Sequence, residues 1–97
     1  MQIVYRKQFA KHLKQRIKPF PSLYKKFKER VELFVQSPDN PMLQDHQLKG
    51  EIIRFRAFSV TGDIRIIYQK EKDYIYFVDI GTHNQVYWLK INAIKNL

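Results

Sequence analysis

The chain has 97 residues, of which 44% are hydrophobic, contains no cysteine and carries a net charge of +9. This length suits a single domain covering residues 1–97 with one modest core, and the composition excludes intrinsic disorder, disulfide scaffolds and cysteine-ligated zinc sites. There is no apolar run long enough for a membrane span and no apolar N-terminal core typical of a signal peptide, so we expect a cytoplasmic protein that does not act in a membrane.

The positive charge is concentrated in the first 30 residues, where Glu29 is the only acidic side chain. Such a segment attracts phosphate backbones, anionic membrane or an acidic protein partner, and salt screens each of these attractions. A solvated cationic surface without a dedicated partner is the alternative. The basic residues of this segment are Arg6, Lys7, Lys11, Lys14, Arg16, Lys18, Lys25, Lys26, Lys28 and Arg30.

The chain begins with a predicted strand and a predicted helix. Residues 2–5 form a short apolar run typical of a strand. Phe9, Leu13 and Ile17 then recur every four residues, which places them on one face of a helix. His12 falls in a basic stretch that we expect to be exposed, and we assign it no role. The lysines of another face of this helix are Lys7, Lys11, Lys14 and Lys18.

A second predicted helix follows two prolines. Pro19 and Pro21 interrupt the first helix because neither can donate a backbone hydrogen bond. Ser22 is a plausible N-cap for a helix that runs to about Gln36 and is stopped by residues 37–41. We expect the two helices to pack as a hairpin over a sheet. The apolar face of the second helix comprises Tyr24, Phe27, Val31, Phe34 and Val35.

The second half of the chain predicts a β-meander. Residues 52–60, 64–69 and 74–80 are rich in β-formers, and residues 61–63 form a tight-turn signature between the first two strands. Residues 86–97 could form an edge strand or a tail helix. The expected class is α+β, with an N-terminal strand and a two-helix hairpin packed on a small twisted antiparallel sheet.

Arginines alternate with apolar residues in the predicted strands. Arg54 and Arg56 share a parity with Phe58 and therefore project from one face, where they could hold phosphates or base edges. Arg65 shares its parity with Ile67 in the next strand. Either face of the sheet remains a candidate for the site.

Three short motifs stand out in the second half of the chain: His-Gln-Leu-Lys-Gly at residues 46–50, Asp-Ile-Arg-Ile-Ile-Tyr at residues 63–68 and Gly-Thr-His at residues 81–83. Together with the order of elements, these motifs resemble the RelE/ParE superfamily of bacterial type II toxins, and most of all its YafQ branch. The resemblance implies a ribosome-dependent endoribonuclease that cuts messenger RNA in the ribosomal A site. It also implies neutralisation by an antitoxin encoded beside the toxin.

The same resemblance implies that His46, Asp63 and His83 are catalytic, and that Tyr87 lies near the substrate, where its phenol can stack on a base. RNA cleavage without a metal needs a base for the 2′-hydroxyl, an acid for the departing 5′-oxygen and cations for the phosphate. We assign His83 as the acid and either His46 or Asp63 as the base or the group that orients it. Asp63 could instead be a turn residue whose carboxylate bonds nearby amides. The candidate phosphate ligands are Arg54, Arg56 and Arg65.

Two departures from the branch matter for activity: Ser59 stands where it has a further active-site histidine, and Ile64 where it has tryptophan. The alternatives to a nuclease are therefore a non-catalytic ParE-like inhibitor of DNA gyrase and a plain nucleic-acid-binding module. No metal or cofactor is expected, because three scattered histidines form no ligand spacing. The expected partners are an acidic antitoxin, the ribosome and messenger RNA, with a monomeric free toxin and a hetero-oligomeric complex.

Overall fold

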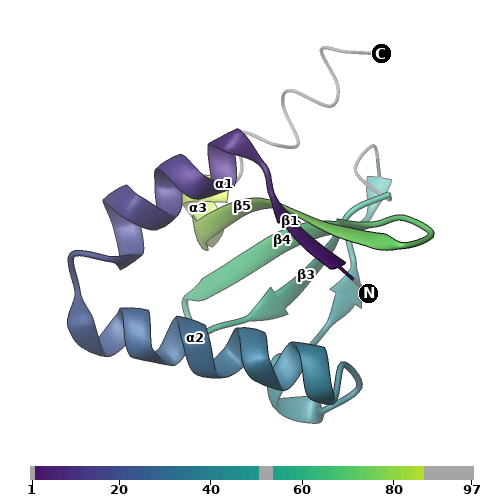
Figure 1. The fold of residues 1–97 in the computed structure, drawn as a ribbon, viewed down its shortest axis with the longest axis horizontal. Coiled ribbons are helices and arrows are strands. Elements are labelled where there is room, and N and C mark those ends of the chain that lie inside the picture. The colour runs from purple at the N-terminus through teal and green to yellow at the C-terminus, as the bar shows by residue number, and fades with distance from the viewer. Residues whose placement is uncertain (1, 51–53, 87–97) are drawn as a thin grey trace.

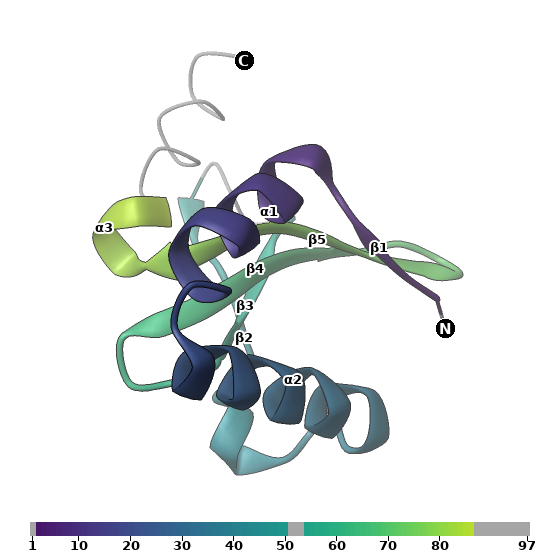
Figure 2. The same ribbon diagram turned by 60° about the vertical axis from the view of Figure 1, so that its left-hand side comes forward.

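The computed structural model describes residues 2–50 and 54–86. Figures 1 and 2 show two long helical segments on the same side of a twisted sheet, with a short helix beyond the end of the last strand. This arrangement confirms the expected α+β class. In chain order the elements are β1 (Gln2–Tyr5), α1 (Lys7–His12), the π-helical turn η1 (Leu13–Ile17), α2 (Pro21–Gln36), the 3-10 turn η2 (Pro41–Leu43), β2 (His46–Gln47), β3 (Arg56–Ser59), β4 (Ile64–Lys70), β5 (Tyr74–Thr82) and α3 (His83–Val86).

The sheet has five strands in the order β1-β5-β4-β3-β2. The meander β3-β4-β5 is antiparallel as predicted, but β1 pairs in parallel with β5, so the sheet is mixed rather than purely antiparallel. The helical hairpin carries the chain from β1 at one edge to β2 at the other. This crossover over one face is what allows the first and last strands to be parallel neighbours.

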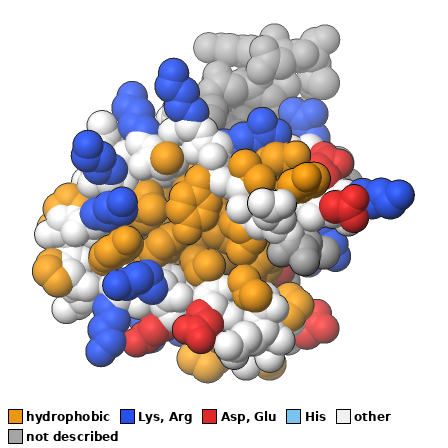
Figure 3. All heavy atoms as spheres, viewed as in Figure 1, with side chains coloured by type: hydrophobic (Ala, Val, Ile, Leu, Met, Phe, Trp, Pro, Cys, Tyr) orange, Lys and Arg blue, Asp and Glu red, His pale blue; other side chains and the backbone are white. Residues whose placement is uncertain are grey.

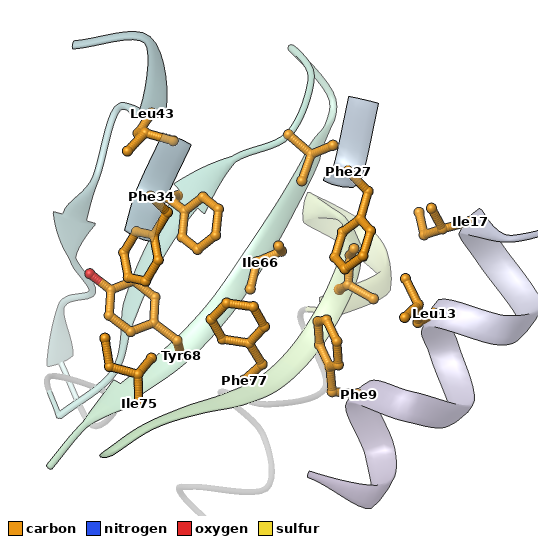
Figure 4. Close-up of a cluster of buried hydrophobic side chains, with 13 residues drawn as sticks. Phe9, Leu13, Ile17, Phe27, Phe34, Leu43, Ile66, Tyr68, Ile75 and Phe77 are labelled. Carbon is orange, nitrogen blue, oxygen red and sulfur yellow. The ribbon is translucent and has the colours of Figure 1, made fainter. Parts of the chain in front are cut away.

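The main core lies between the helices and the sheet (Figure 4). Phe9, Leu13 and Ile17 are all buried there, which confirms their predicted shared face, and Phe27 and Phe34 of α2 join them. We call this side of the sheet the helix-covered face. A smaller cluster lies on the opposite side, which we call the second face; its buried members are Phe55, Ala57, Ile67 and Val86.

Three details of the helices differ from what the sequence predicted. The first helix does not stay regular: after α1 the amide of Lys18 donates to the carbonyl of Leu13 at 2.9 Å, which closes a wider π turn. His12 is buried rather than exposed. The second helix begins at Pro21 with Phe20 in the N-cap position, not at Ser22, because proline needs no partner for an amide at the first helical residue.

The strand limits also differ from those predicted. Of the expected strand 52–60, the structure assigns Arg56–Ser59 to β3 and places Arg54 in a turn; residues 52–53 lie outside the described ranges. β5 continues to Thr82, which pairs with Ile64. The expected edge strand or tail at residues 86–97 is described only at Val86, the last residue of α3. Among the described residues, no helix is long and apolar enough to cross a membrane.

Candidate active site

His46 begins the short edge strand β2, where it pairs with Ala57 and is exposed. Its Nδ1 lies 2.9 Å from the carbonyl oxygen of Gln44. Since a carbonyl only accepts, Nδ1 carries the proton of the neutral ring and Nε2 keeps its lone pair. Gln44 has a φ of 49°, a left-handed conformation that is uncommon outside glycine. The carbonyl of Gln44 therefore favours the Nδ1–H tautomer of the exposed imidazole, whose Nε2 can accept a proton as a general base does.

Three residues form one row across the centre of the sheet: Ser59 pairs with Arg65, and Arg65 pairs with Gly81. Partners in a row point to the same face, so Arg65 lies between a small side chain and no side chain. Its Nε is buried without a hydrogen-bond partner in the part of the chain that is described. No carboxylate of the described residues pairs with this guanidinium, which leaves its charge for an outside anion such as a phosphate.

Asp63 and His83 lie at the same end of the sheet. Ile64 and Thr82 are the last pair of the β4–β5 ladder; Asp63 directly precedes Ile64, and His83 directly follows Thr82. Both side chains are exposed. The turn before β4 is closed by the Thr61 hydroxyl, which accepts from the amides of Asp63 at 3.2 Å and Ile64 at 3.0 Å. A side chain other than that of Asp63 therefore caps this turn.

The segment that carries His83 is held by a reciprocal pair of hydrogen bonds. The amide of Thr82 donates to Oε1 of Gln85 at 2.8 Å, and the amide of Gln85 donates to the Thr82 hydroxyl at 3.2 Å. This is the geometry of a capping box, and it orients the first turn of α3. His83 projects from a short turn that is fixed at both ends.

The fold does not bring all predicted residues together. Asp63, Arg65 and His83 share one end of the sheet, whereas His46 is on the far edge, three strand spacings of about 4.8 Å from β5. Arg54 lies exposed at the opposite end of β3, with its guanidinium 5.0 Å from the ring centre of Phe55. The predicted contribution of Tyr87 lies outside the described residues.

Arg56 faces the helix-covered side, with Phe58 as predicted but away from Arg65. Its Nε donates to Oδ1 of Asp45 at 3.0 Å and to the Tyr68 hydroxyl at 3.1 Å. Burial opposes its charge, but the bonds to Tyr68 and Asp45 outweigh this and raise the pKa of Arg56. Burial, with the neighbouring Asp45 carboxylate, also raises the pKa of Tyr68 well above its usual value. Arg56 thus has an internal anion, unlike Arg65.

The sequence analysis did not predict one cluster of ionisable side chains. His12, Arg16 and Asp79 meet where α1 passes the edge of β5, and Asp79 is fully buried. Residues 74–80 held the available signal: a single aspartate inside an otherwise apolar and aromatic strand must find a buried partner. Among the described residues, no group of three potential ligand side chains gathers to hold a metal ion.

Comparison with known proteins identifies the family. Residues 1–87 match the family described as "Bacterial toxin of type II toxin-antitoxin system, YafQ". A search of curated protein sequences finds no significant match.

Solved structures agree on the fold. A metal-bound toxin from Helicobacter pylori is 29% identical, with a TM-score of 0.72 over 90% of this chain and 99% of that one. YafQ in the Escherichia coli DinJ-YafQ toxin-antitoxin complex is 23% identical, with a TM-score of 0.70 over 89% and 96%. A YoeB/ParE toxin from Agrobacterium tumefaciens is 13% identical, with a TM-score of 0.72 over 86% and 99%. With the family match spanning most of its length, the chain belongs to the YafQ family of toxins of bacterial type II toxin-antitoxin systems.

Proposed function

We propose that this toxin is a ribosome-dependent endoribonuclease that cleaves messenger RNA by metal-independent acid/base catalysis. The proposal rests on one observation: three polar side chains of the kinds that this reaction needs lie at the same end of the sheet. An exposed histidine, His83, lies at the same end of the sheet as Asp63 and Arg65, and the guanidinium of Arg65 has no carboxylate partner among the described residues. An acid, a base and a cation for the phosphate are the groups this reaction needs.

In the proposed reaction, the base takes the proton of the ribose 2′-hydroxyl, whose oxygen attacks the adjacent phosphorus and displaces the 5′-oxygen. His83 protonates that leaving oxygen, and Arg65 stabilises the charge on the phosphate. Asp63 is the better situated base because it lies at the same end of the sheet as His83, whereas His46 lies on the far edge strand. His46, with its free Nε2, would contact a nucleotide farther along a strand of RNA laid across the sheet, near the exposed Arg54.

Primer extension on a message translated in a reconstituted bacterial system tests the function. Wild-type protein should cut within codons only when ribosomes are present, and His83→Ala should abolish the cuts. Asn84→Ala is the matched control, since it alters the next exposed residue of the same helix. Intact message from a protein that is still toxic in cells would overturn the nuclease and favour inhibition of gyrase. RNA binding that weakens steeply with salt, without cleavage or toxicity, would indicate a plain binding module.

The pH dependence of cleavage distinguishes the two candidate bases. A histidine base ordinarily loses activity as the pH falls through about 6.5, whereas an aspartate base stays ionised down to about pH 4. If Asp63 is the base, the cleavage rate of Asp63→Asn should no longer fall at acid pH, because the group that must be deprotonated is gone. His46→Ala should mainly raise KM. A large loss of kcat in His46→Ala with Asp63→Asn unaffected would reverse the assignment.

The gyrase alternative has one specific observation in its favour. The Ser59 hydroxyl, at the position where the branch has a histidine, donates to the carbonyl of Thr61 at 2.5 Å. It is therefore engaged within its own turn and supplies no acid or base. The grouping of Asp63, Arg65 and His83 supports the nuclease more strongly, because a protein that only binds gyrase has no need of it.

The partner we propose is an acidic antitoxin segment bound across α1 and α2, which keeps a monomeric cytoplasmic toxin inactive in a hetero-oligomeric complex. In Figure 3 hydrophobic side chains gather between these helices, with lysine and arginine side chains around them. Tyr5 contacts Phe9 at a ring separation of 4.7 Å, and Lys28 lies 4.7 Å from the ring centre of Tyr24. Burial, together with the nearby Tyr24, raises the pKa of Tyr5, so this floor is partly desolvated. An apolar floor with a cationic rim suits an acidic amphipathic segment.

A further inference from the structure

Side chains cover the edge of β5 over its second half. β1 pairs with residues 74–77 of β5, and no other strand of the described residues pairs with this edge at Asp79 and Ile80. His12 Nδ1 lies 2.6 Å from Oδ1 of Asp79, and Arg16 Nη1 donates to the carbonyl of Ile80 at 2.8 Å. A buried carboxylate and an unpaired strand carbonyl are both costly unless satisfied, and these two side chains satisfy them.

The guanidinium of Arg16 has further contacts besides the carbonyl of Ile80. Its Nη1 lies 3.7 Å from Asp79 Oδ1, and its Nη2 lies 3.3 Å from Nε2 of His12. The carboxylate of Asp79 in turn accepts from the amide of Ile80 at 2.8 Å. Arg16 also lies within the π turn η1, whose extra residue per turn changes the direction in which its side chain projects. Helix geometry and ion pairing therefore fix one orientation of the guanidinium.

The guanidinium packs directly against the backbone of Gly81. A Cβ atom at Gly81 would lie 2.7 Å from Arg16 Nη1 and 2.7 Å from Gln85 Oε1, closer than real Cβ contacts allow. Gln85 is the same residue whose side chain holds the amide of Thr82. The contacts thus run without a gap from Arg16 through Gly81 to the turn that begins at His83.

We propose that Arg16, locked by Asp79 and His12, is a positioning residue that sets the direction of the Gly81–Gln85 turn and thereby of His83. Arg16 does not touch the substrate in this role, because the contacts above direct its guanidinium to β5 and to His12. The catalytic part of the inference rests on the proposed nuclease function. The structural part, that Arg16 orders this turn, stands independently of it.

Amide hydrogen exchange tests the structural part without any activity. In Arg16→Gln the amides of Thr82 and Gln85 should exchange about tenfold faster or more, since their hydrogen bonds depend on a turn that has lost its support. Lys14→Gln is the matched control, because Lys14 lies in the same π turn but is exposed. Unchanged protection of both amides in Arg16→Gln would overturn the proposal.

Single-turnover cleavage on ribosomes tests the catalytic part. Arg16→Gln should lower kcat about 10- to 100-fold with KM unchanged, as expected for a misdirected catalytic group. Arg16→Lys should recover part of the rate, because an ammonium can reach the Ile80 carbonyl but cannot also bond His12. Ile17→Val, at a fully buried neighbouring position, provides a variant that is destabilised but should keep its kcat.

The outcomes separate the two proposals. An equal loss of kcat in Ile17→Val and Arg16→Gln would overturn positioning, because stability alone would then explain it. The amides of Thr82 and Gln85 could exchange faster in Arg16→Gln although the wild-type protein cuts no message. That result would establish the role of Arg16 in ordering the turn and reject the nuclease function. Normal cleavage by Arg16→Gln despite faster exchange would overturn the catalytic part.

Discussion

Ser59 is the residue whose identity bears most directly on activity. It lies beside Arg65 in the central row of the sheet, and its hydroxyl is engaged by Thr61. Ser59→His would place an imidazole next to the proposed phosphate site, as in the branch this chain resembles. We expect the single-turnover cleavage rate to rise about tenfold or more, since one acid or base group commonly contributes about 10²- to 10⁴-fold. An unchanged rate, with Ser59→Ala as control, would show that the existing groups suffice.

The raised pKa of Tyr68 makes the free energy of unfolding depend on pH in the alkaline range. Its hydroxyl donates to Oδ2 of Asp45, and burial followed by that bond raises the pKa of Tyr68 in the folded state. An unfolded tyrosine titrates near pH 10, so the unfolded state releases this proton first. The contribution of Tyr68 is therefore fully present below about pH 10 and is lost as the pH rises toward its folded pKa.

Denaturant titrations between pH 8 and 11 check this sign. The free energy of unfolding of the wild type should fall above about pH 10, and Tyr68→Phe should be less stable at pH 8 but show a weaker decline. Tyr74→Phe, an exposed tyrosine, is the control and should retain the wild-type slope. A wild-type slope in Tyr68→Phe would assign the alkaline instability to other groups.

At the scale of elements, α2 is anchored to the sheet by aromatic contacts. The ring of Phe34 stacks on that of Phe58 at 4.4 Å and meets Tyr68 edge-on at 5.0 Å. Phe34→Ala should lower the free energy of unfolding by about 3–5 kcal/mol, since the helix cannot fill the cavity. Val35→Ala, one residue along and 61% exposed, should change stability by less than about 0.5 kcal/mol. Similar losses in both variants, measured by urea unfolding, would mean that helix propensity dominates.

At the scale of the whole molecule, charge is separated between layers. The basic residues of the first 30 positions belong to the helices and the segments that flank them, and exposed lysines such as Lys18 and Lys28 lie on this layer. Affinity for the proposed acidic antitoxin should therefore weaken with salt, because the Debye length falls from about 10 Å at 0.1 M to about 3 Å at 1 M.

Calorimetric titration with that antitoxin checks this prediction. Lys18→Glu combined with Lys28→Glu should weaken binding about tenfold or more at low salt and flatten its salt dependence. Lys70→Glu combined with Lys72→Glu, at the end of β4 and in the turn after it, is the control with the same change of charge. Equal effects of the control and the double variant would assign the attraction to net charge rather than to this surface.

Much of the fold follows from local patterns. The fourfold spacing of Phe9, Leu13 and Ile17 predicted a helix and its buried face, and alternation within the strands grouped Arg56 with Phe58 and Arg65 with Ile67. Local backbone geometry fixes both periods, so a single sequence is enough to read them. The same reasoning missed the π turn, since a one-residue widening of the helix leaves this spacing almost unchanged.

By itself the sequence determined the helices, the meander, the segregation of basic charge and the motifs that predicted the family. Only the tertiary structure decided which residues meet: that Arg56 has Asp45 as its anion while Arg65 has no such partner among the described residues, and that His12 is buried against Asp79. It also placed His83 and Asp63 at one end of the sheet and left His46 at the far edge. These outcomes depend on strand order and on the crossover between the sheet edges. Periodicity along the chain carries no information about contacts between residues far apart in sequence, and these contacts form only when the layers pack.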